Sequence, residues 1–143
     1  NMENNIICSG ALFYSTSTKR FLFLQRTSEK TKGMWGLVGG RMKYTESAFE
    51  GLKREIQEEI GNTPTFKKVI PLELFTSNDQ KFYFHTYLVA VTDEFLPKLN
   101  QEHSGYCWCA FECWPKNLHG GLRNTLNNKA IKGKLQTNLD LIT

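Results

Sequence analysis

The acidic residues between Gly40 and Gly61 have the types and the spacing that a divalent-cation site needs. Four glutamates and one arginine stand at set distances from these glycines: Glu46, Arg54, Glu55, Glu58 and Glu59. Carboxylate oxygens are the ligands that Mg²⁺ and Mn²⁺ prefer, and Mg²⁺ is usually held by a few carboxylates together with substrate phosphates and water. The pattern therefore indicates metal-assisted chemistry on a phosphate-containing substrate.

The same stretch predicts one amphipathic helix that begins near Thr45 or Ser47, either of which can cap it, and ends at Ile60. Residues three and four positions apart share a helix face, so the last three glutamates of the set are neighbours. Like charges on one face destabilise a helix by roughly a few tenths of a kcal/mol per pair, and a bound cation reverses that cost. The apolar residues form a separate stripe for the core: Phe49, Leu52, Ile56 and Ile60. A solvated acidic face is the plain alternative, and it leaves the accompanying arginine and glycines unexplained.

This segment resembles the Nudix box, the signature of the Nudix hydrolase family. The box reads Gly, five residues, Glu, seven residues, Arg-Glu, an aliphatic residue, any residue, Glu-Glu, any residue, Gly and an aliphatic residue. The chain fills every specified position from Gly40 to Gly61 and departs at the last one, where Asn62 stands. The departure lies at the exit of the helix, so it affects local packing more than chemistry.

The resemblance implies roles for the residues that match the box. Glu58 and Glu59 are implied as metal ligands, and the Gly40 carbonyl as a further ligand. Glu55 is implied as another ligand or as the carboxylate that takes the proton of a water. The implied reaction is substitution by water at phosphorus, which splits a diphosphate linkage with the help of Mg²⁺, for which Mn²⁺ can substitute.

Further residues complete the predicted catalytic set. Arg54 is implied to orient or pair with a box carboxylate, and Glu46 to hold the loop against the helix through a salt bridge. Many family members take an extra glutamate from a loop after the sheet. Glu102 is our candidate for that ligand or base, and His103 is the runner-up because imidazole titrates near neutral pH. Whether Glu55 or Glu102 is the base stays open, and so does a merely solvated role for the two loop residues.

Three aromatic residues are candidates for contact with the substrate. Tyr83 and Phe84 alternate on a predicted strand, so one face of that strand can stack on a base while the other enters the core. Tyr44 lies in the box loop, where it can flank the phosphates. Ordinary core or surface packing is the commoner role for such residues.

The length of 143 residues fits a single domain, which we expect to span 2–143, with Asn1 before Met2 as a cloning remnant. A weaker helical region is predicted over Leu122–Leu141, interrupted at Asn127–Asn128 and Gly133. Strands around a central helix indicate an α/β fold, and the resemblance implies the Nudix fold, an α/β/α sandwich with a mixed sheet. The predicted strands are Ile6–Tyr14, Arg20–Arg26, Trp35–Val38, Phe66–Phe75, Lys81–Val91 and Tyr106–Phe111.

Charge and composition limit the ligands and the cellular location that we expect for the protein. The net charge of +4 is mild, and basic residues gather after Pro115. Such a surface suits nucleotides or RNA 5′ ends, although solubility is the plainer explanation. The chain shows neither an apolar run long enough to span a membrane nor a secretory signal, so we predict a cytoplasmic location without membrane contact. The resemblance leaves a homodimer open.

Three functions are in contention. The first is a Mg²⁺-dependent Nudix pyrophosphohydrolase that cleaves a nucleoside diphosphate derivative, such as ADP-ribose, a dinucleoside polyphosphate, a nucleotide sugar or FAD. The second is a pyrophosphohydrolase of nucleoside triphosphates, deoxynucleoside triphosphates or RNA 5′ ends. The third is a nucleotide-binding or sensor module without turnover, which the complete set of box carboxylates argues against.

Overall fold

The computed structural model describes residues 5–142, so the expectation for Asn1 lies outside the described residues. A 3-10 turn, Glu29–Thr31, lies in the loop between the second and third strands. The strands and α-helices of the described chain are β1 (Ile6–Ser15), β2 (Arg20–Arg26), β3 (Trp35–Gly36), β4 (Val38–Arg41), α1 (Ala48–Ile60), β5 (Lys68–Thr76), β6 (Phe82–Val91), β7 (His103–Ala110), α2 (Gly120–Asn127) and α3 (Lys129–Leu141).

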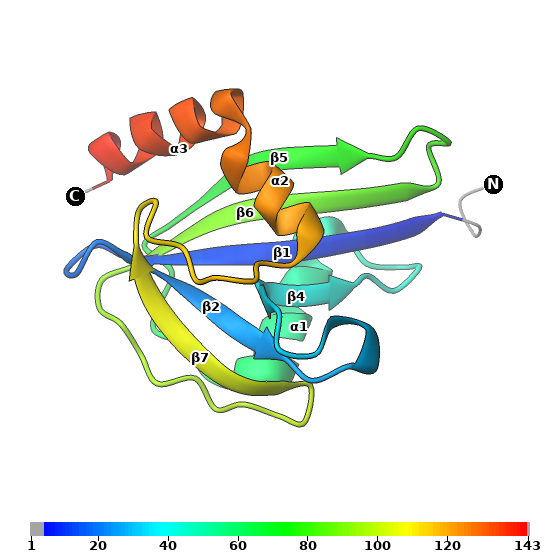
Figure 1. The fold of residues 1–143 in the computed structure, drawn as a ribbon, viewed down its shortest axis with the longest axis horizontal. Coiled ribbons are helices and arrows are strands. Elements are labelled where there is room, and N and C mark those ends of the chain that lie inside the picture. The colour runs from blue at the N-terminus through cyan, green and yellow to red at the C-terminus, as the bar shows by residue number, and fades with distance from the viewer. Residues whose placement is uncertain (1–4, 143) are drawn as a thin grey trace.

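The strands form one mixed sheet with β1 at its centre (Figure 1). β1 pairs in parallel with β6 and antiparallel with β2 and β4. β5 is the edge strand beside β6, in the predicted hairpin, and β7 pairs antiparallel with β2. α1 lies on one face of the sheet, and α2 and α3 lie on the other. The predicted α/β fold with a mixed sheet is therefore confirmed.

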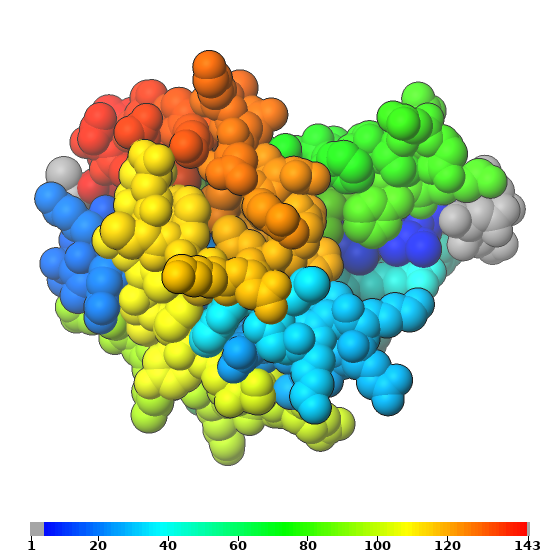
Figure 2. All heavy atoms as spheres, viewed as in Figure 1, coloured from blue at the N-terminus to red at the C-terminus, as the bar shows by residue number. Residues whose placement is uncertain are grey.

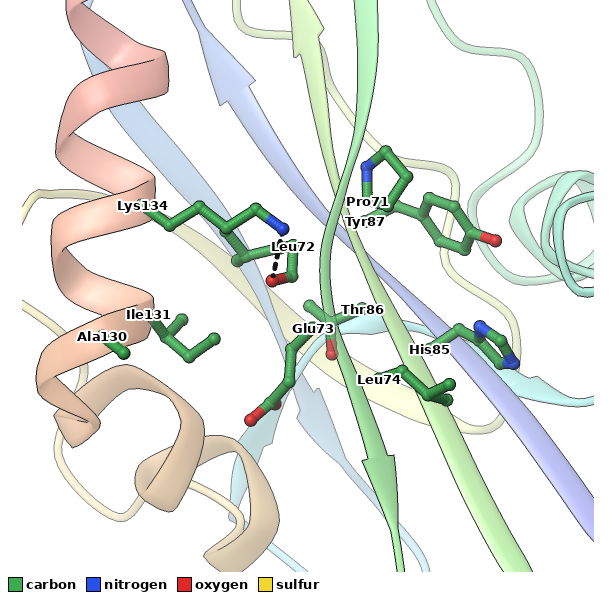
Figure 3. Close-up of a pocket in the computed structure, with 10 residues that line it drawn as sticks. All are labelled: Pro71, Leu72, Glu73, Leu74, His85, Thr86, Tyr87, Ala130, Ile131 and Lys134. Carbon is green, nitrogen blue, oxygen red and sulfur yellow. Dashed lines mark hydrogen bonds between the residues drawn. The ribbon is translucent and has the colours of Figure 1, made fainter.

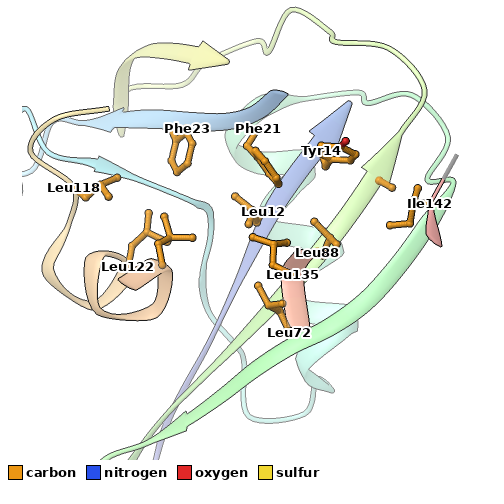
Figure 4. Packing of buried hydrophobic residues seen from close by; sticks show 12 residues of the cluster. Leu12, Tyr14, Phe21, Phe23, Leu72, Leu88, Leu118, Leu122, Leu135 and Ile142 are labelled. Carbon is orange, nitrogen blue, oxygen red and sulfur yellow. The ribbon is translucent and has the colours of Figure 1, made fainter. Parts of the chain in front are cut away.

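Two apolar layers, one on each face of the sheet, hold the helices in place. Successive side chains of a strand point to opposite faces, so β1 contributes to both layers. Leu12 and Tyr14 pack with α2 and α3 in the layer of Figure 4. Phe13 packs in the second layer with Leu52 and Ile56 of α1. The apolar stripe of the box helix is thus packed against this face of the sheet.

Two glycines that follow the predicted strand Trp35–Val38 lie within a strand of their own. Gly39 and Gly40 lie inside β4, opposite Gly10 and Ser9 of β1. Pairing with the central strand fixes the backbone that leads into the box helix. The helix itself begins after Ser47, which settles the choice between the two predicted caps.

Two further segments differ from their predicted bounds. β7 begins at His103, three residues before the predicted Tyr106, because this segment pairs with β2 as far as Arg26. The C-terminal region forms two helices that are separated at Asn128, whose side chain accepts a hydrogen bond from the first turn of α3. Gly133 lies within α3 and does not interrupt it. Across residues 5–142, no helix has the length and the apolar character to cross a membrane.

Candidate active site

The box helix α1 starts with a reciprocal cap that sets the direction of its acidic face. The Ser47 hydroxyl accepts from the Glu50 backbone N–H at 3.1 Å, and the Glu50 carboxylate accepts from the Ser47 N–H at 3.1 Å. This capping box satisfies two backbone donors that the helix itself leaves unpaired. Ser9 of β1 adds a link, because its hydroxyl donates to the Ala48 carbonyl at 3.1 Å.

Arg54 connects three of the predicted acidic residues. Its guanidinium contacts both oxygens of Glu46 at 2.7 and 3.0 Å, Oε1 of Glu55 at 2.9 Å and Glu58 at 3.2 Å. Hydrogen bonds from Arg54 and from the Lys43 backbone hold the pKa of Glu46 down at about 2. The salt bridge expected of Glu46 is therefore confirmed, and the structure identifies Arg54 as its partner; Arg54 also pairs with box carboxylates as predicted.

Glu59 is the buried acid of the site. Its side chain is 3% exposed, and its Oε1 accepts from the Gly39 backbone N–H at 2.9 Å. The pKa of Glu59 is raised to about 8, mainly by burial and to a lesser degree by the charges of Glu102 and Glu55, against the lowering effect of the Gly39 hydrogen bond. Burial likewise raises the pKa of Glu55. These carboxylates resist carrying negative charge together unless a cation joins them.

The two glycines of β4 make room for these acids. A side chain at Gly39 would place its Cβ 2.0 Å from the Ser9 carbonyl oxygen, and the residue has a φ of +154°. A Cβ at Gly40 would lie 2.6 Å from Oε2 of Glu55. Glu55 therefore holds Arg54 with one oxygen and turns the other toward the backbone of Gly40. The structure brings these two predicted metal ligands together.

The loop that carries Glu102 lies beside the same acids. Glu102 is exposed, and its charge acts on both Glu55 and Glu59. His103, by contrast, is buried in β7, and its Nδ1 has no hydrogen-bond partner among the described residues. Burial lowers the pKa of His103, and the Arg26 charge lowers it further. The expectation that His103 lies in a loop is wrong, because β7 extends through it.

The three candidate aromatic residues are not brought together. Phe84 lies on the α2 face of the sheet, where its ring fills the space left by the missing side chain of Gly10, next to Leu37. Tyr83 points to the opposite face, as alternation along β6 requires. Tyr44 is 73% exposed in the loop before α1. Figure 2 shows the α2 side of the molecule hollowed between α2 and the far ends of β5 and β6, with β1 at the floor.

Arg26 is a charged residue at the site that the sequence analysis missed. It ends β2, and its Nε donates to the Thr31 hydroxyl at 2.8 Å. Burial lowers the pKa of His119, and the Arg26 charge lowers it further. The same charge opposes the raised pKa of Glu59. The sequence signal for this residue was an arginine at the end of an apolar strand, where a charged side chain can lie at the edge of the sheet.

The oxygen donors of the box have the chemistry of a site for a divalent cation. Within residues 5–142, no group of three or more His, Cys, Asp or Glu side chains is gathered closely enough to hold an ion. The oxygens are nevertheless of the type that Mg²⁺ and Mn²⁺ prefer. Burial, and to a lesser degree the charges of neighbouring glutamates, raise the pKa of Glu55 and of Glu59, and a cation bound beside them would relieve this cost. The chemistry of the site therefore fits a hard divalent cation.

A cavity of about 510 Å³ lies elsewhere, at the β5 edge beside α3 (Figure 3). The Lys134 ammonium donates to the Leu72 carbonyl there at 3.2 Å. Its lining comes from β5, β6 and α3 and includes none of the box residues. Size alone therefore does not make this cavity the active site, and the chemistry points to the acids of α1.

Comparisons with known proteins relate the chain to one family. The family model described as NUDIX domain matches residues 7–128. The nucleoside triphosphatase NudI of Escherichia coli O139:H28 is 30% identical over 110 residues, which covers 69% of this chain and 78% of that protein. NudI of Klebsiella pneumoniae strain 342 is 26% identical with the same coverage.

Solved structures are similar in fold. The MutT NUDIX hydrolase from Burkholderia pseudomallei aligns over 87% of this chain and 98% of that one, with a TM-score of 0.71 and 23% identity. A C. elegans Ap4A hydrolase, solved as a binary complex, aligns over 93% of this chain and 98% of that one, with a TM-score of 0.70 and 20% identity. At these identities the likeness establishes the fold.

Proposed function

We propose a metal-dependent activity on the premise that this chain belongs to the Nudix family and is a pyrophosphatase of that family. In this proposal the protein hydrolyses a diphosphate linkage in a nucleotide with the help of Mg²⁺ or Mn²⁺. The observation that carries the proposal is the buried carboxylate of Glu59 beside the glycines of β4. The pKa of Glu59 is raised to about 8, mainly by burial and further by the charges of Glu102 and Glu55. Such strongly perturbed acids are typical of functional sites.

Four groups of this chain would hold the cation: the carbonyl of Gly40 and the carboxylates of Glu55, Glu58 and Glu59. A bound Mg²⁺ or Mn²⁺ would neutralise the charge of the diphosphate and make a water more acidic. Arg54 orients Glu55 and Glu58 through the hydrogen bonds described above, so we assign it a positioning role rather than contact with substrate.

We assign the base to Glu102, with Glu55 as the alternative. Glu102 is exposed and has no arginine partner in the structure, whereas Glu55 already shares the Arg54 guanidinium. In the proposed step the water oxygen forms a bond to phosphorus while the bond from phosphorus to the leaving phosphate oxygen breaks. The proton of the water goes to the base carboxylate. Arg26 supports the site with positive charge beside Glu59.

Among substrates, we favour nucleoside triphosphates over nucleoside diphosphate derivatives. The NudI relatives are nucleoside triphosphatases. At up to 30% identity they are more informative about the substrate than the solved structures, which are 23% and 20% identical. Phe84 lies on the α2 face of the sheet and is our candidate for stacking on the base, with Tyr44 flanking the phosphates. Tyr83 faces the other side of the sheet, so we expect it to pack against neighbouring side chains and not to contact the substrate. The four free thiols fit the cytoplasmic location that such substrates would require.

The test is a hydrolysis panel with Mg²⁺ and Mn²⁺, with products separated by charge. It covers NTPs, dNTPs, ADP-ribose, dinucleoside polyphosphates, nucleotide sugars, FAD and 5′-triphosphate RNA. The RNA is included because Arg123 and Lys129 are exposed on α2 and α3. We expect release of pyrophosphate or a mononucleotide from one preferred class. Size-exclusion chromatography of the same sample tests for a homodimer.

Matched variants connect any turnover to the site. Glu58→Gln and Glu59→Gln should each lower kcat by about 100-fold or more, because a lost ligand costs at least as much as the 10- to 100-fold typical of an outer partner. Glu102→Gln against Glu55→Gln identifies the base. If the folded protein binds nucleotide and metal but hydrolyses none of these substrates, the proposed hydrolase activity is replaced by a nucleotide-sensing role. Wild-type rates in both ligand variants would refute the metal assignment.

A further inference from the structure

The C-terminal end of α1 is capped by a distant segment of the chain. The last carbonyls of a helix have no partner inside it and must find donors elsewhere. Two of these carbonyls accept hydrogen bonds from the segment that precedes β7. The Lys98 backbone N–H donates to the Ile60 carbonyl at 2.9 Å, and Nδ2 of Asn100 donates to the Glu58 carbonyl at 3.1 Å. The helix that carries the box acids is thereby tied to the Glu102 loop.

The Asn100 side chain also holds Glu102 itself. Its Nδ2 lies 3.2 Å from Oε2 of Glu102, and its Oδ1 accepts from the Glu102 backbone N–H at 2.9 Å. A side-chain amide has two N–H donors and an acceptor oxygen, so all three hydrogen bonds can exist together. One amide therefore links the Glu58 carbonyl, the Glu102 backbone and the Glu102 carboxylate.

The other side of the loop is fastened to the end of β2. The Thr27 N–H donates to the Glu102 carbonyl at 3.1 Å, and the Thr27 hydroxyl donates to the Gln101 carbonyl at 2.8 Å. These contacts fix the backbone and leave the carboxylate free. An exposed glutamate has several rotamers, and holding it in one costs side-chain entropy. Within the described chain, the Asn100 amide is the side-chain group that restrains the Glu102 carboxylate by a hydrogen bond.

We infer that Asn100 is a positioning residue that holds the Glu102 carboxylate against the acids of α1 and so sets its contribution to hydrolysis. The inference rests on the proposed function, and it names a residue outside the box on which that function depends. Asn100 touches neither the substrate nor the reacting atoms in this account, because it acts through Glu102. The competing explanation is a turn-forming role, in which the Oδ1 contact to the Glu102 N–H alone matters.

Asn100→Asp separates these two explanations. Aspartate keeps the acceptor for the Glu102 N–H, so it preserves the turn, but it has no N–H for the Glu102 carboxylate or for the Glu58 carbonyl. We expect Asn100→Asp and Asn100→Ala each to lower kcat by about 10- to 100-fold, with KM within about twofold of wild type. Gln101→Ala is the matched control in the same loop and should keep wild-type kinetics. Wild-type kcat in Asn100→Asp would overturn the inference.

A double-mutant cycle shows whether Asn100 acts through Glu102. In a Glu102→Ala background the carboxylate to be positioned is gone, so adding Asn100→Ala should lower kcat by less than about twofold. If the two losses multiply in full, Asn100 acts independently of Glu102 and the inference fails.

Amide hydrogen exchange, followed by NMR on the metal-free protein, tests the same contacts without turnover. We expect the Glu102 N–H to exchange about 10-fold faster in Asn100→Ala and at the wild-type rate in Asn100→Asp, while the Lys98 N–H, which caps the helix independently, stays protected in both. Fast exchange at Glu102 in Asn100→Asp as well would assign any loss of kcat to the turn and overturn the positioning role. Lack of hydrolysis by the wild type, with the exchange result as expected, would instead refute the proposed function.

Discussion

Glu59 is the residue in which the folding and the chemistry of the site conflict most directly. Burial of its carboxylate satisfies the Gly39 N–H, yet it removes the charged form from water beside Glu55 and Glu102. A metal-free protein relieves this conflict by keeping Glu59 protonated, which is what a pKa of about 8 means. A cation would relieve it by neutralising the charge.

The raised pKa predicts how the stability of the metal-free protein depends on pH. The folded-state pKa of Glu59 lies above its ordinary value of 4.5, so the folded state retains a proton that the unfolded state loses. The contribution of Glu59 to the free energy of unfolding is therefore highest below pH 4.5 and falls as the pH rises toward about 8, by on the order of a few kcal/mol at most. Urea unfolding at pH 5, 6.5 and 8 measures it.

Glu59→Gln is the control for that pH dependence. The amide keeps an oxygen for the Gly39 N–H and cannot ionise, so its stability should fall less over the same pH range. The difference between the two proteins isolates Glu59 from histidines and other titrating groups. Parallel curves for wild type and variant would show that Glu59 ionises at its ordinary pKa.

At the scale of elements, α1 depends on contacts at both of its ends. Ser47→Ala removes the hydroxyl that accepts the Glu50 N–H, and we expect a loss of about 1 kcal/mol in the free energy of unfolding. Thr45→Ala is the matched control two residues earlier, outside the cap, and should change stability by less than about 0.5 kcal/mol. Equal losses in the two variants would show that the helix starts earlier than described.

β4 depends on the absence of a side chain at Gly39. Gly39→Ala would place a methyl group 2.0 Å from the Ser9 carbonyl oxygen, so the pairing of β4 with β1 must shift. We expect a loss of about 2 kcal/mol or more in thermal or urea unfolding. Gly120→Ala is the control, because a Cβ there meets no atom within 4 Å. A Gly39→Ala protein as stable as Gly120→Ala would mean that β4 pairs differently.

For the whole molecule, metal binding should appear as stability before any substrate is known. A ligand that binds only the folded state at 100 times its Kd adds about 2.7 kcal/mol. We expect Mn²⁺ to raise the Tm of the wild type, and EDTA to reverse the rise. The Glu58→Gln, Glu59→Gln double variant should fold and show almost no rise. A rise of equal size in that variant would place the metal elsewhere.

The sequence by itself determined the box helix and the family. The acids, the arginine and the apolar stripe are local patterns, because residues three and four apart meet on one helix whatever surrounds it. The same holds for β2, whose bounds were predicted correctly from its alternating and apolar residues. The salt bridge predicted for Glu46, whose partner in the structure is Arg54, needed only the loop that leads into that helix.

Only the tertiary structure decided which acid is buried and what surrounds it. Glu59 meets Gly39 because β4 pairs with β1, and Glu102 approaches α1 because β7 pairs with β2. The burial of His103 and the placement of Asn100 follow from the same pairing. These contacts join residues twenty to more than forty positions apart. No local periodicity encodes them, since strand pairing and helix packing bring such distant residues together only in the folded chain.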